Sequence, residues 1–172
     1  MNKSNIVLIG MPGVGKSTVG VILAKLAGKA FCDTDLVIQE RTGRLLSEII
    51  AERGAEGFID LENRQIAALV ARNSVIATGG SAVYGEEAMQ ALARDGVIVY
   101  LKASFGLLDS RLSDIKGRGV VSRPGQSLCD IYDERCPLYE KYADVTVLCD
   151  GAGVEKTVGR ILEAVAEMKN RN

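Results

Sequence analysis

The sequence contains no histidine, so it lacks the residue that most often serves proteins as general base and metal ligand. Any catalytic chemistry must therefore use carboxylates, lysine, arginine or a hydrated metal ion. The cysteines are also uninformative as a set, because they lie far apart and form no C-x-x-C pair. They are Cys32, Cys129, Cys136 and Cys149. We expect reduced thiols in a cytoplasmic protein, rather than a disulfide framework or a zinc site.

Long hydrophobic runs and an excess of one charge are absent too. No segment approaches the length of a membrane span, and the apolar run near the N-terminus is too short for a signal peptide. The formal net charge is −1, which gives no overall attraction to nucleic acid or to an anionic membrane. The 172 residues, 47% of them hydrophobic, can form one core. We expect a single domain over residues 1–172 that is monomeric and binds neither nucleic acid nor membrane.

One segment matches every position of the phosphate-binding motif G-x-x-x-x-G-K-[ST]: Gly10-Met11-Pro12-Gly13-Val14-Gly15-Lys16-Ser17. Glycines allow the backbone to turn tightly and to point its N–H groups at a polyphosphate. Lys16 can reach the β- and γ-phosphates, and the Ser17 hydroxyl suits a Mg²⁺ ligand. The motif predicts a nucleoside triphosphate site formed by Gly13, Val14, Gly15, Lys16, Ser17 and Thr18.

The surrounding pattern alternates short apolar runs with helical periodicity, which is typical of a parallel sheet covered on both faces. We expect strands at about 5–10, 30–32, 74–77, 97–101 and 145–148. Helices are expected at about 16–28, 33–42, 46–53, 57–72 and 105–112. Another helix follows the polar stretch at 113–125 and extends to about 142, and one more lies at the C-terminus. The predicted fold is α/β, a five-stranded parallel sheet with helices on both faces in a three-layer α/β/α arrangement. Ligands of such sheets bind beyond the carboxyl ends of the strands, where Asp33, Asp35, Gly79 and Gly80 fall.

Asp33 and Asp35 place two carboxylates next to the expected phosphate site. A phosphoryl-transfer enzyme can use one to hold water on Mg²⁺ and the other to accept the proton of an attacking hydroxyl. Aspartates that cap the following helix would give the same sequence pattern.

Several motifs occur together in one order: GMPGVGKST, Phe31-Cys32-Asp33-Thr34-Asp35, Thr78-Gly79-Gly80, Arg123-Pro124 and Arg135-Cys136-Pro137-Leu138-Tyr139. With them the chain resembles, over nearly its whole length, the shikimate kinases of the nucleoside monophosphate kinase-like group. The resemblance implies ATP as phosphoryl donor, Mg²⁺ as cofactor and a small hydroxy acid as acceptor.

The resemblance also implies roles for individual residues. Ser17 and Asp33 would serve the metal, and Lys16, Asp35 and Arg123 would be catalytic. Arg123 would close from a mobile lid at about 113–125, in which Lys116 or Arg118 would pack on adenine. The acceptor would lie against a helical region at about 34–62. The implied acceptor-binding residues are Asp35, Gly79, Gly80, Ser81 and Arg135, of which Arg135 would hold a carboxylate.

The acceptor half departs from the family pattern G-E-x-x-F-R-x-x-E. Ala55 stands in place of the first glutamate and Ile59 in place of the arginine, and Ser81 follows two glycines where a third is common. Isoleucine cannot donate a hydrogen bond, and the loss of one such contact to a carboxylate costs about 1.5–3 kcal/mol. The resemblance makes shikimate the leading acceptor. These departures make homoserine, gluconate or another hydroxy acid alternatives. A nucleoside monophosphate acceptor and a nucleotide-binding protein without catalysis are further alternatives.

Overall fold

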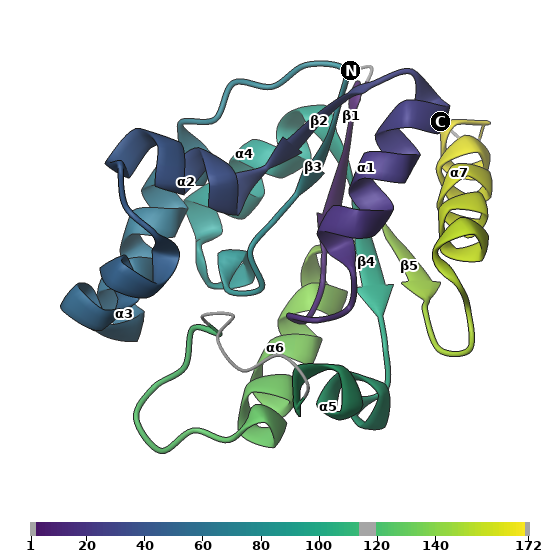
Figure 1. Ribbon diagram of the computed structural model, residues 1–172. Helices are drawn as coiled ribbons and strands as arrows, with labels where there is room; N and C mark the ends of the chain where they lie inside the picture. Colours follow the sequence, from purple (N-terminus) through teal and green to yellow (C-terminus); the bar gives the residue numbers. More distant parts are fainter. Residues whose placement is uncertain (1–2, 114–119, 171–172) are drawn as a thin grey trace.

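The computed structural model describes residues 3–113 and 120–170, and they form one sheet flanked by helices (Figure 1). The strands are β1 (Asn5–Ile9), β2 (Ala30–Asp33), β3 (Ser74–Ala77), β4 (Gly96–Lys102) and β5 (Val145–Leu148). The helices are α1 (Lys16–Ala27), α2 (Thr34–Thr42), α3 (Leu46–Ala67), α4 (Glu86–Asp95), α5 (Phe105–Ser113), α6 (Leu128–Tyr142) and α7 (Val154–Asn170). A short 3₁₀ helix, η1, covers Ala82–Tyr84.

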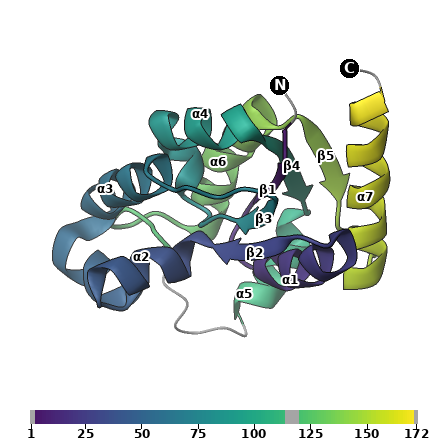
Figure 2. The same ribbon diagram turned by 90° about the horizontal axis from the view of Figure 1, so that it is seen from above.

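All strand pairs are parallel, and the strand order is β2-β3-β1-β4-β5. Helices α1 and α7 lie on one face, while α4 and α6 lie on the other (Figure 2). Strands β1 and β3 are fully buried because both of their faces are covered, which explains their uninterrupted apolar sequences. The predicted five-stranded parallel sheet and the three-layer α/β/α fold are confirmed.

Strand order places the loop after β1 at the centre of the sheet. The chain leaves β1 toward β2 at one edge of the sheet and leaves β3 in the opposite direction, past β1, toward β4, so the connections from these two neighbouring strands diverge. Such a switch point opens a crevice at the carboxyl ends of the strands. The loops that follow β1, β2 and β3 all end at this crevice, and they carry the glycine-rich motif, the two aspartates and the Gly79-Gly80 pair.

The helix boundaries differ from the sequence-based expectations in two places. The helix expected at 57–72 is too long, because α3 ends at Ala67. The chain then turns through Asn73, whose φ is +49°, into β3. Helix α4 was not predicted, although Ala88, Met89 and Leu92 form its buried face. The break expected between the two segments of α3 does occur, at Gly54, where φ is +70° and only glycine is free of strain.

Helices α2 and α3 form a second, smaller core beside the sheet. Its buried members are Ile38, Ile49, Phe58, Leu61 and Val121, with Ile59 among the half-buried side chains packed on them. Val121 comes from the expected lid segment, so part of that segment packs against this region. The lid predicted at 113–125 falls partly outside the described residues, and the division into lid and acceptor-binding region stays a prediction.

The four cysteines are free thiols, with Cys149 buried and Cys129 exposed. Within residues 3–113 and 120–170, no helix combines the length and the apolar character needed to span a membrane.

Candidate active site

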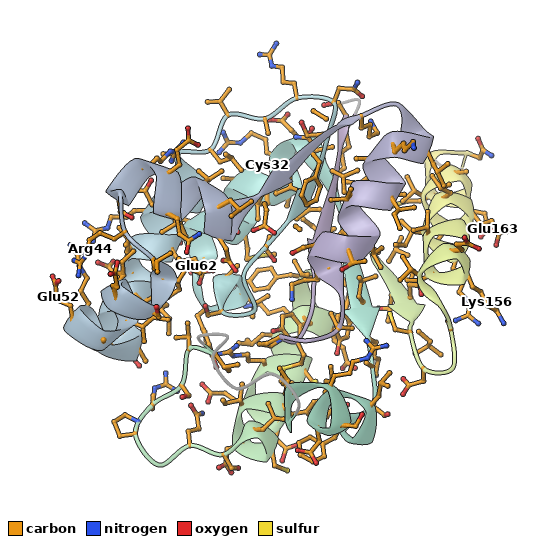
Figure 3. All side chains as sticks on the ribbon, viewed as in Figure 1. Cys32, Arg44, Glu52, Glu62, Lys156 and Glu163 are labelled. Atoms are coloured by element: carbon orange, nitrogen blue, oxygen red, sulfur yellow. The ribbon has the colours of Figure 1, made fainter. Side chains whose placement is uncertain are left out.

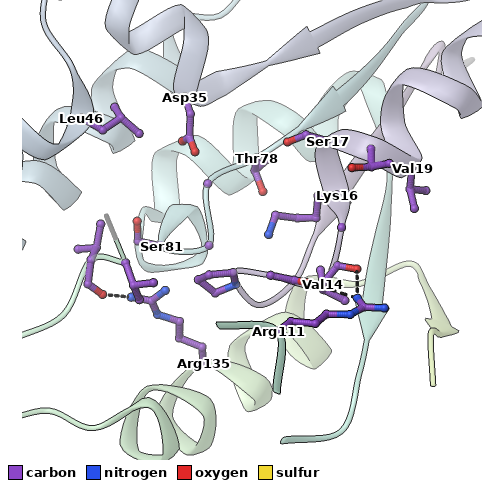
Figure 4. A pocket seen from close by; sticks show the side chains of 18 of the residues that line it. Val14, Lys16, Ser17, Val19, Asp35, Leu46, Thr78, Ser81, Arg111 and Arg135 are labelled. Carbon is purple, nitrogen blue, oxygen red and sulfur yellow. Dashed lines mark hydrogen bonds between the residues drawn. The ribbon is translucent and has the colours of Figure 1, made fainter. Parts of the chain in front are cut away.

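A cavity of about 1000 Å³ lies in the crevice at the carboxyl ends of the strands. It brings together most of the predicted site residues, and Figure 4 shows Asp35, Ser81, Lys16 and Arg135 arranged around the same space. The predicted residues that line it are Gly13, Val14, Gly15, Lys16, Ser17, Thr18, Asp35, Gly79, Gly80, Ser81 and Arg135. Asp33 and Arg123 are not part of the lining, and Lys116 and Arg118 lie outside the described residues.

The phosphate-binding loop connects β1 to the N-terminus of α1. Gly15 precedes the helix with φ +103°, a conformation that other residues rarely adopt. Lys16 is only 8% exposed, and its ammonium donates hydrogen bonds to the carbonyl oxygens of Gly10 at 2.8 Å and Met11 at 2.9 Å. Burial lowers the pKa of Lys16 to about 8, although the charge of Asp35 opposes the shift. A polyphosphate at this helix N-terminus would meet a buried cation together with backbone N–H groups.

Asp33 makes two hydrogen bonds, one of which is the helix cap that the sequence allowed. One carboxylate oxygen accepts a hydrogen bond from the N–H of Asp35 at 3.0 Å and so caps α2. The other accepts from the Ser17 hydroxyl at 2.7 Å. This hydroxyl–carboxylate pair beside the phosphate loop consists of the hard oxygen donors that Mg²⁺ prefers.

The acceptor half of the cavity lies around Asp35 and the two glycines after β3. Burial raises the pKa of Asp35 to about 6, with the charge of Asp33 adding to the shift and Lys16 opposing it. A Cβ at Gly79 would lie 2.8 Å from Asp35 Oδ1, and a Cβ at Gly80 would lie 3.2 Å from Arg135 Nη1. A side chain at either glycine would therefore collide with its surroundings, and the backbone of Gly79 and Gly80 lies directly against a carboxylate and a guanidinium that both line the cavity.

Arg135 is a buried cation on α6, with 2% of its surface exposed. Its Nη2 donates to the Val121 carbonyl, its Nε donates to the Tyr84 hydroxyl at 3.3 Å, and its guanidinium lies 5.2 Å from the centre of the Tyr84 ring. No ion pair joins Arg135 to a carboxylate of the described residues. Since a buried charge is stabilised by a partner, the guanidinium is well suited to receive an anion from the cavity.

Arg123 lies outside the cavity. Its guanidinium bridges Glu56 at 2.7 Å and Glu134 at 2.8 Å, and it lies 5.8 Å from the centre of the Tyr84 ring. Its side chain is 45% exposed, and exposed ion pairs contribute only about 0–1 kcal/mol each. The contact of Arg123 with the transferred phosphate stays a prediction. To make that contact, Arg123 would have to leave its two weak ion pairs with Glu56 and Glu134.

The sequence analysis missed Arg111. This residue lies in the last turn of α5, and its guanidinium donates to the carbonyl oxygens of Gly13 at 3.3 Å and Val14 at 3.2 Å. It lines the cavity beside the phosphate loop (Figure 4). The only signal in the sequence is a basic residue just before the expected lid, in which Lys116 and Arg118 are the other basic candidates.

The residue that replaces the family arginine, Ile59, packs in the second core and does not line the cavity. Arg64, the next arginine along α3, forms an ion pair with Asp60 at 2.6 Å on the surface and does not line the cavity. The glutamate one turn after Ile59, Glu62, is buried and does line the cavity. The acceptor half thus contains one guanidinium and two carboxyl groups.

Comparison with known proteins agrees with this geometry. The family model for shikimate kinase matches residues 12–166. Proteins named shikimate kinase from Thermodesulfovibrio yellowstonii and Pseudomonas paraeruginosa are 37% and 38% identical; the alignments cover 96% and 97% of this chain and 97% and 99% of theirs. A solved shikimate kinase from Acinetobacter baumannii in complex with shikimate superposes with a TM-score of 0.85 at 30% identity, covering 96% of this chain and 94% of that one. The resemblance inferred from the motifs is confirmed, and the chain belongs to the shikimate kinase family of ATP-dependent small-molecule kinases.

Proposed function

We propose that this protein transfers the γ-phosphoryl group of ATP to a hydroxyl of shikimate, giving shikimate 3-phosphate and ADP. The observation that carries the proposal is that one cavity contains both the phosphate loop and the acceptor set of Asp35, Gly79, Gly80 and Arg135. The Acinetobacter baumannii relative, whose structure contains shikimate, supports the same acceptor.

The donor half binds and orients the triphosphate. Backbone N–H groups at the start of α1 and the Lys16 ammonium hold the β- and γ-phosphates, so that Lys16 exchanges its carbonyl partners for phosphate oxygens. Ser17 would ligate Mg²⁺ and Asp33 would help to hold the ion, since their oxygen atoms lie 2.7 Å apart beside the phosphate loop. When bound, the ion neutralises charge on the phosphates.

In the acceptor half, Asp35 orients the attacking hydroxyl and takes up its proton. The hydroxyl oxygen forms a bond to the γ-phosphorus while the bond to the β-phosphate oxygen breaks, and ADP leaves. A pKa of about 6 keeps Asp35 ionised at neutral pH and close enough to that pH to act as a general base. Gly79 and Gly80 line the same cavity, and because they have no side chain their backbone can approach the acceptor closely.

Arg135 alone binds the carboxylate of the acceptor, because Ile59 occupies the position where the family pattern has a second arginine. The buried guanidinium lacks a carboxylate partner among the described residues, and it has N–H groups beyond the two that bond to Val121 and Tyr84. Loss of the second arginine weakens this contact, so a higher KM for the acceptor is expected than in relatives that retain it.

Closure over the nucleotide completes the site. Arg123 leaves Glu56 and Glu134 to contact the transferred phosphoryl group, and Arg111 lies on the nucleotide side of the phosphate loop. Lys116 or Arg118 supplies a contact to adenine. A cytoplasmic location and a monomeric state complete the proposal, and light scattering of the purified protein tests the latter.

The experiment that tests the function is a measurement of ADP release with ATP and Mg²⁺, comparing shikimate with homoserine, gluconate and other hydroxy acids. We expect saturable turnover on shikimate that falls at least a hundredfold in Asp35→Asn. Glu163→Gln on α7, a carboxylate remote from the cavity, is the matched control and should leave turnover unchanged. Turnover on another acceptor alone would refute shikimate as substrate, and ATP binding without turnover on any acceptor would refute the kinase assignment.

A further inference from the structure

Tyr139 is a buried tyrosine that does not line the cavity but bonds to a residue that does. It is the last residue of the motif that begins with Arg135. The two residues are four positions apart on α6, so together with Ile131 they form the buried face of that helix. Arg135 reaches the cavity directly. Any effect of Tyr139 on the reaction must instead act through the residue to which it bonds.

The partner of the Tyr139 hydroxyl is the carbonyl oxygen of Gly80, at 2.6 Å. This distance lies at the short end of the range for such hydrogen bonds. Burial raises the pKa of Tyr139, so the hydroxyl keeps its proton and remains a donor at neutral pH. The hydroxyl also lies 3.9 Å from Met11 Sδ, and the carbonyl oxygen of Met11 accepts from Lys16. One hydroxyl thus contacts a glycine of the acceptor half and the phosphate loop of the donor half.

The bond from Tyr139 fixes a peptide unit whose N–H group is unpaired. The described residues contain no cis peptide bond, so the N–H of Ser81 points opposite to the Gly80 carbonyl and away from Tyr139. Neither this N–H nor the N–H of Gly80 has a hydrogen-bond partner among the described residues. Both residues line the cavity. Two backbone donors in the cavity wall are therefore available to an acceptor molecule.

The same peptide unit is held from two further sides. A Cβ at Gly80 would lie 2.8 Å from two ring atoms of Pro12, so the glycine packs directly on the phosphate loop. The Ser81 hydroxyl donates to Glu62, which Figure 3 shows inside the molecule. Within the part of the chain that the structure describes, Tyr139 is the sole donor to the Gly80 carbonyl. The direction of this carbonyl therefore depends on one hydroxyl.

We propose that Tyr139 is a positioning residue for the acceptor, whose hydroxyl holds the Gly80 carbonyl and so sets the direction of the Ser81 N–H. Without the hydroxyl, the carbonyl lacks a donor and the peptide can rotate toward another one. A guanidinium is close, since a Cβ at Gly80 would lie 3.2 Å from Arg135 Nη1. A rotated carbonyl would compete with the acceptor for Arg135. The inference rests on the proposed function, because it concerns the same reaction.

The test is Tyr139→Phe, which removes only the hydroxyl. We expect the KM for shikimate to rise about three- to tenfold, while kcat and the Kd for ADP change less than about twofold. Tyr100→Phe is the matched control, because the Tyr100 ring is also buried and stacks on Tyr139 with centroids 5.1 Å apart. Its hydroxyl donates to Cys136 Sγ at 3.5 Å rather than to a glycine. This variant should leave KM, kcat and Kd unchanged.

Two results would overturn the inference: a KM within about twofold of the wild type in Tyr139→Phe, or an equal rise in Tyr100→Phe. Hydrogen exchange of residues 79–82, followed by mass spectrometry without substrate, is the second readout. Exchange should be about three- to tenfold faster in Tyr139→Phe than in the wild type or Tyr100→Phe, and equal rates would also overturn the inference. Absence of wild-type turnover on shikimate would refute the proposed function alone, and the exchange rates would then decide the role of Tyr139.

Discussion

The buried ammonium of Lys16 makes nucleotide binding depend on pH in a predictable direction. In the free protein, burial lowers the pKa of Lys16 to about 8, far below the usual 10.5. Bound phosphates surround the ammonium with negative charge and raise its pKa again. Proton uptake therefore accompanies binding, and the affinity falls once pH exceeds the pKa of the free protein.

The magnitude follows from these two pKa values. With a free-state pKa of about 8 and a bound-state pKa at or above 10.5, the Kd for ADP should rise roughly twentyfold between pH 7.5 and 9.5. The phosphates themselves are fully ionised in this range, so they do not contribute to the slope. Lys16→Met should weaken binding, remove the slope, and lower kcat by at least about a hundredfold, because the charge that stabilises the transferring phosphoryl group is gone.

Calorimetric titration with ADP at constant ionic strength, in buffers from pH 7.5 to 9.5, measures the effect. Lys25→Met is the matched control, since Lys25 lies exposed in the last turn of the same helix, α1. It should retain the wild-type slope. A flat Kd in the wild type, or an unchanged slope in Lys16→Met, would refute the reasoning, and an active Lys16→Met enzyme would refute the catalytic assignment.

Three further predictions concern other parts of the cavity. Because the pKa of Glu62 is raised from 4.5 to about 7, the wild type should lose stability relative to Glu62→Gln as pH rises through this interval. The difference in unfolding free energy, measured in urea, should grow by up to about 3 kcal/mol, and a constant difference would contradict the assigned burial. A methyl group at Gly79 would lie against Glu62 and Asp35, so Gly79→Ala should lower kcat/KM for the acceptor at least about tenfold with ADP binding intact. Gly159→Ala, at an open position of α7, should change neither quantity, and a fully active Gly79→Ala enzyme would show that the acceptor lies elsewhere. Arg111→Met should weaken ADP binding by about three- to tenfold without changing the KM of the acceptor, and a change in the acceptor KM alone would exclude Arg111 from the nucleotide side.

The sequence by itself determined the fold class and the donor half of the site. The motif at 10–17 is continuous in the chain, and its glycines, Lys16 and Ser17 act through local backbone geometry that the spacing fixes. The alternation of apolar runs and helical periodicity likewise predicts a parallel sheet, and strand ends then gather Asp33, Asp35 and Gly79 at one edge. The end of α3 was wrong and α4 was not predicted, since helix boundaries and short helices depend on packing as well as on propensity.

The tertiary structure alone decided the contacts between distant segments. Nothing in the spacing indicated that Arg111 would bond to the phosphate loop, or that Arg123 would bridge two glutamates outside the cavity. The pairing of Ser81 with Glu62 joins residues on different elements, and it leaves one carboxyl oxygen without a hydrogen-bond partner among the described residues. Such contacts depend on where β3, α3 and α6 meet in space. A sequence therefore specifies which groups are available, whereas burial and partners, which set charge and orientation, exist only once the chain is folded.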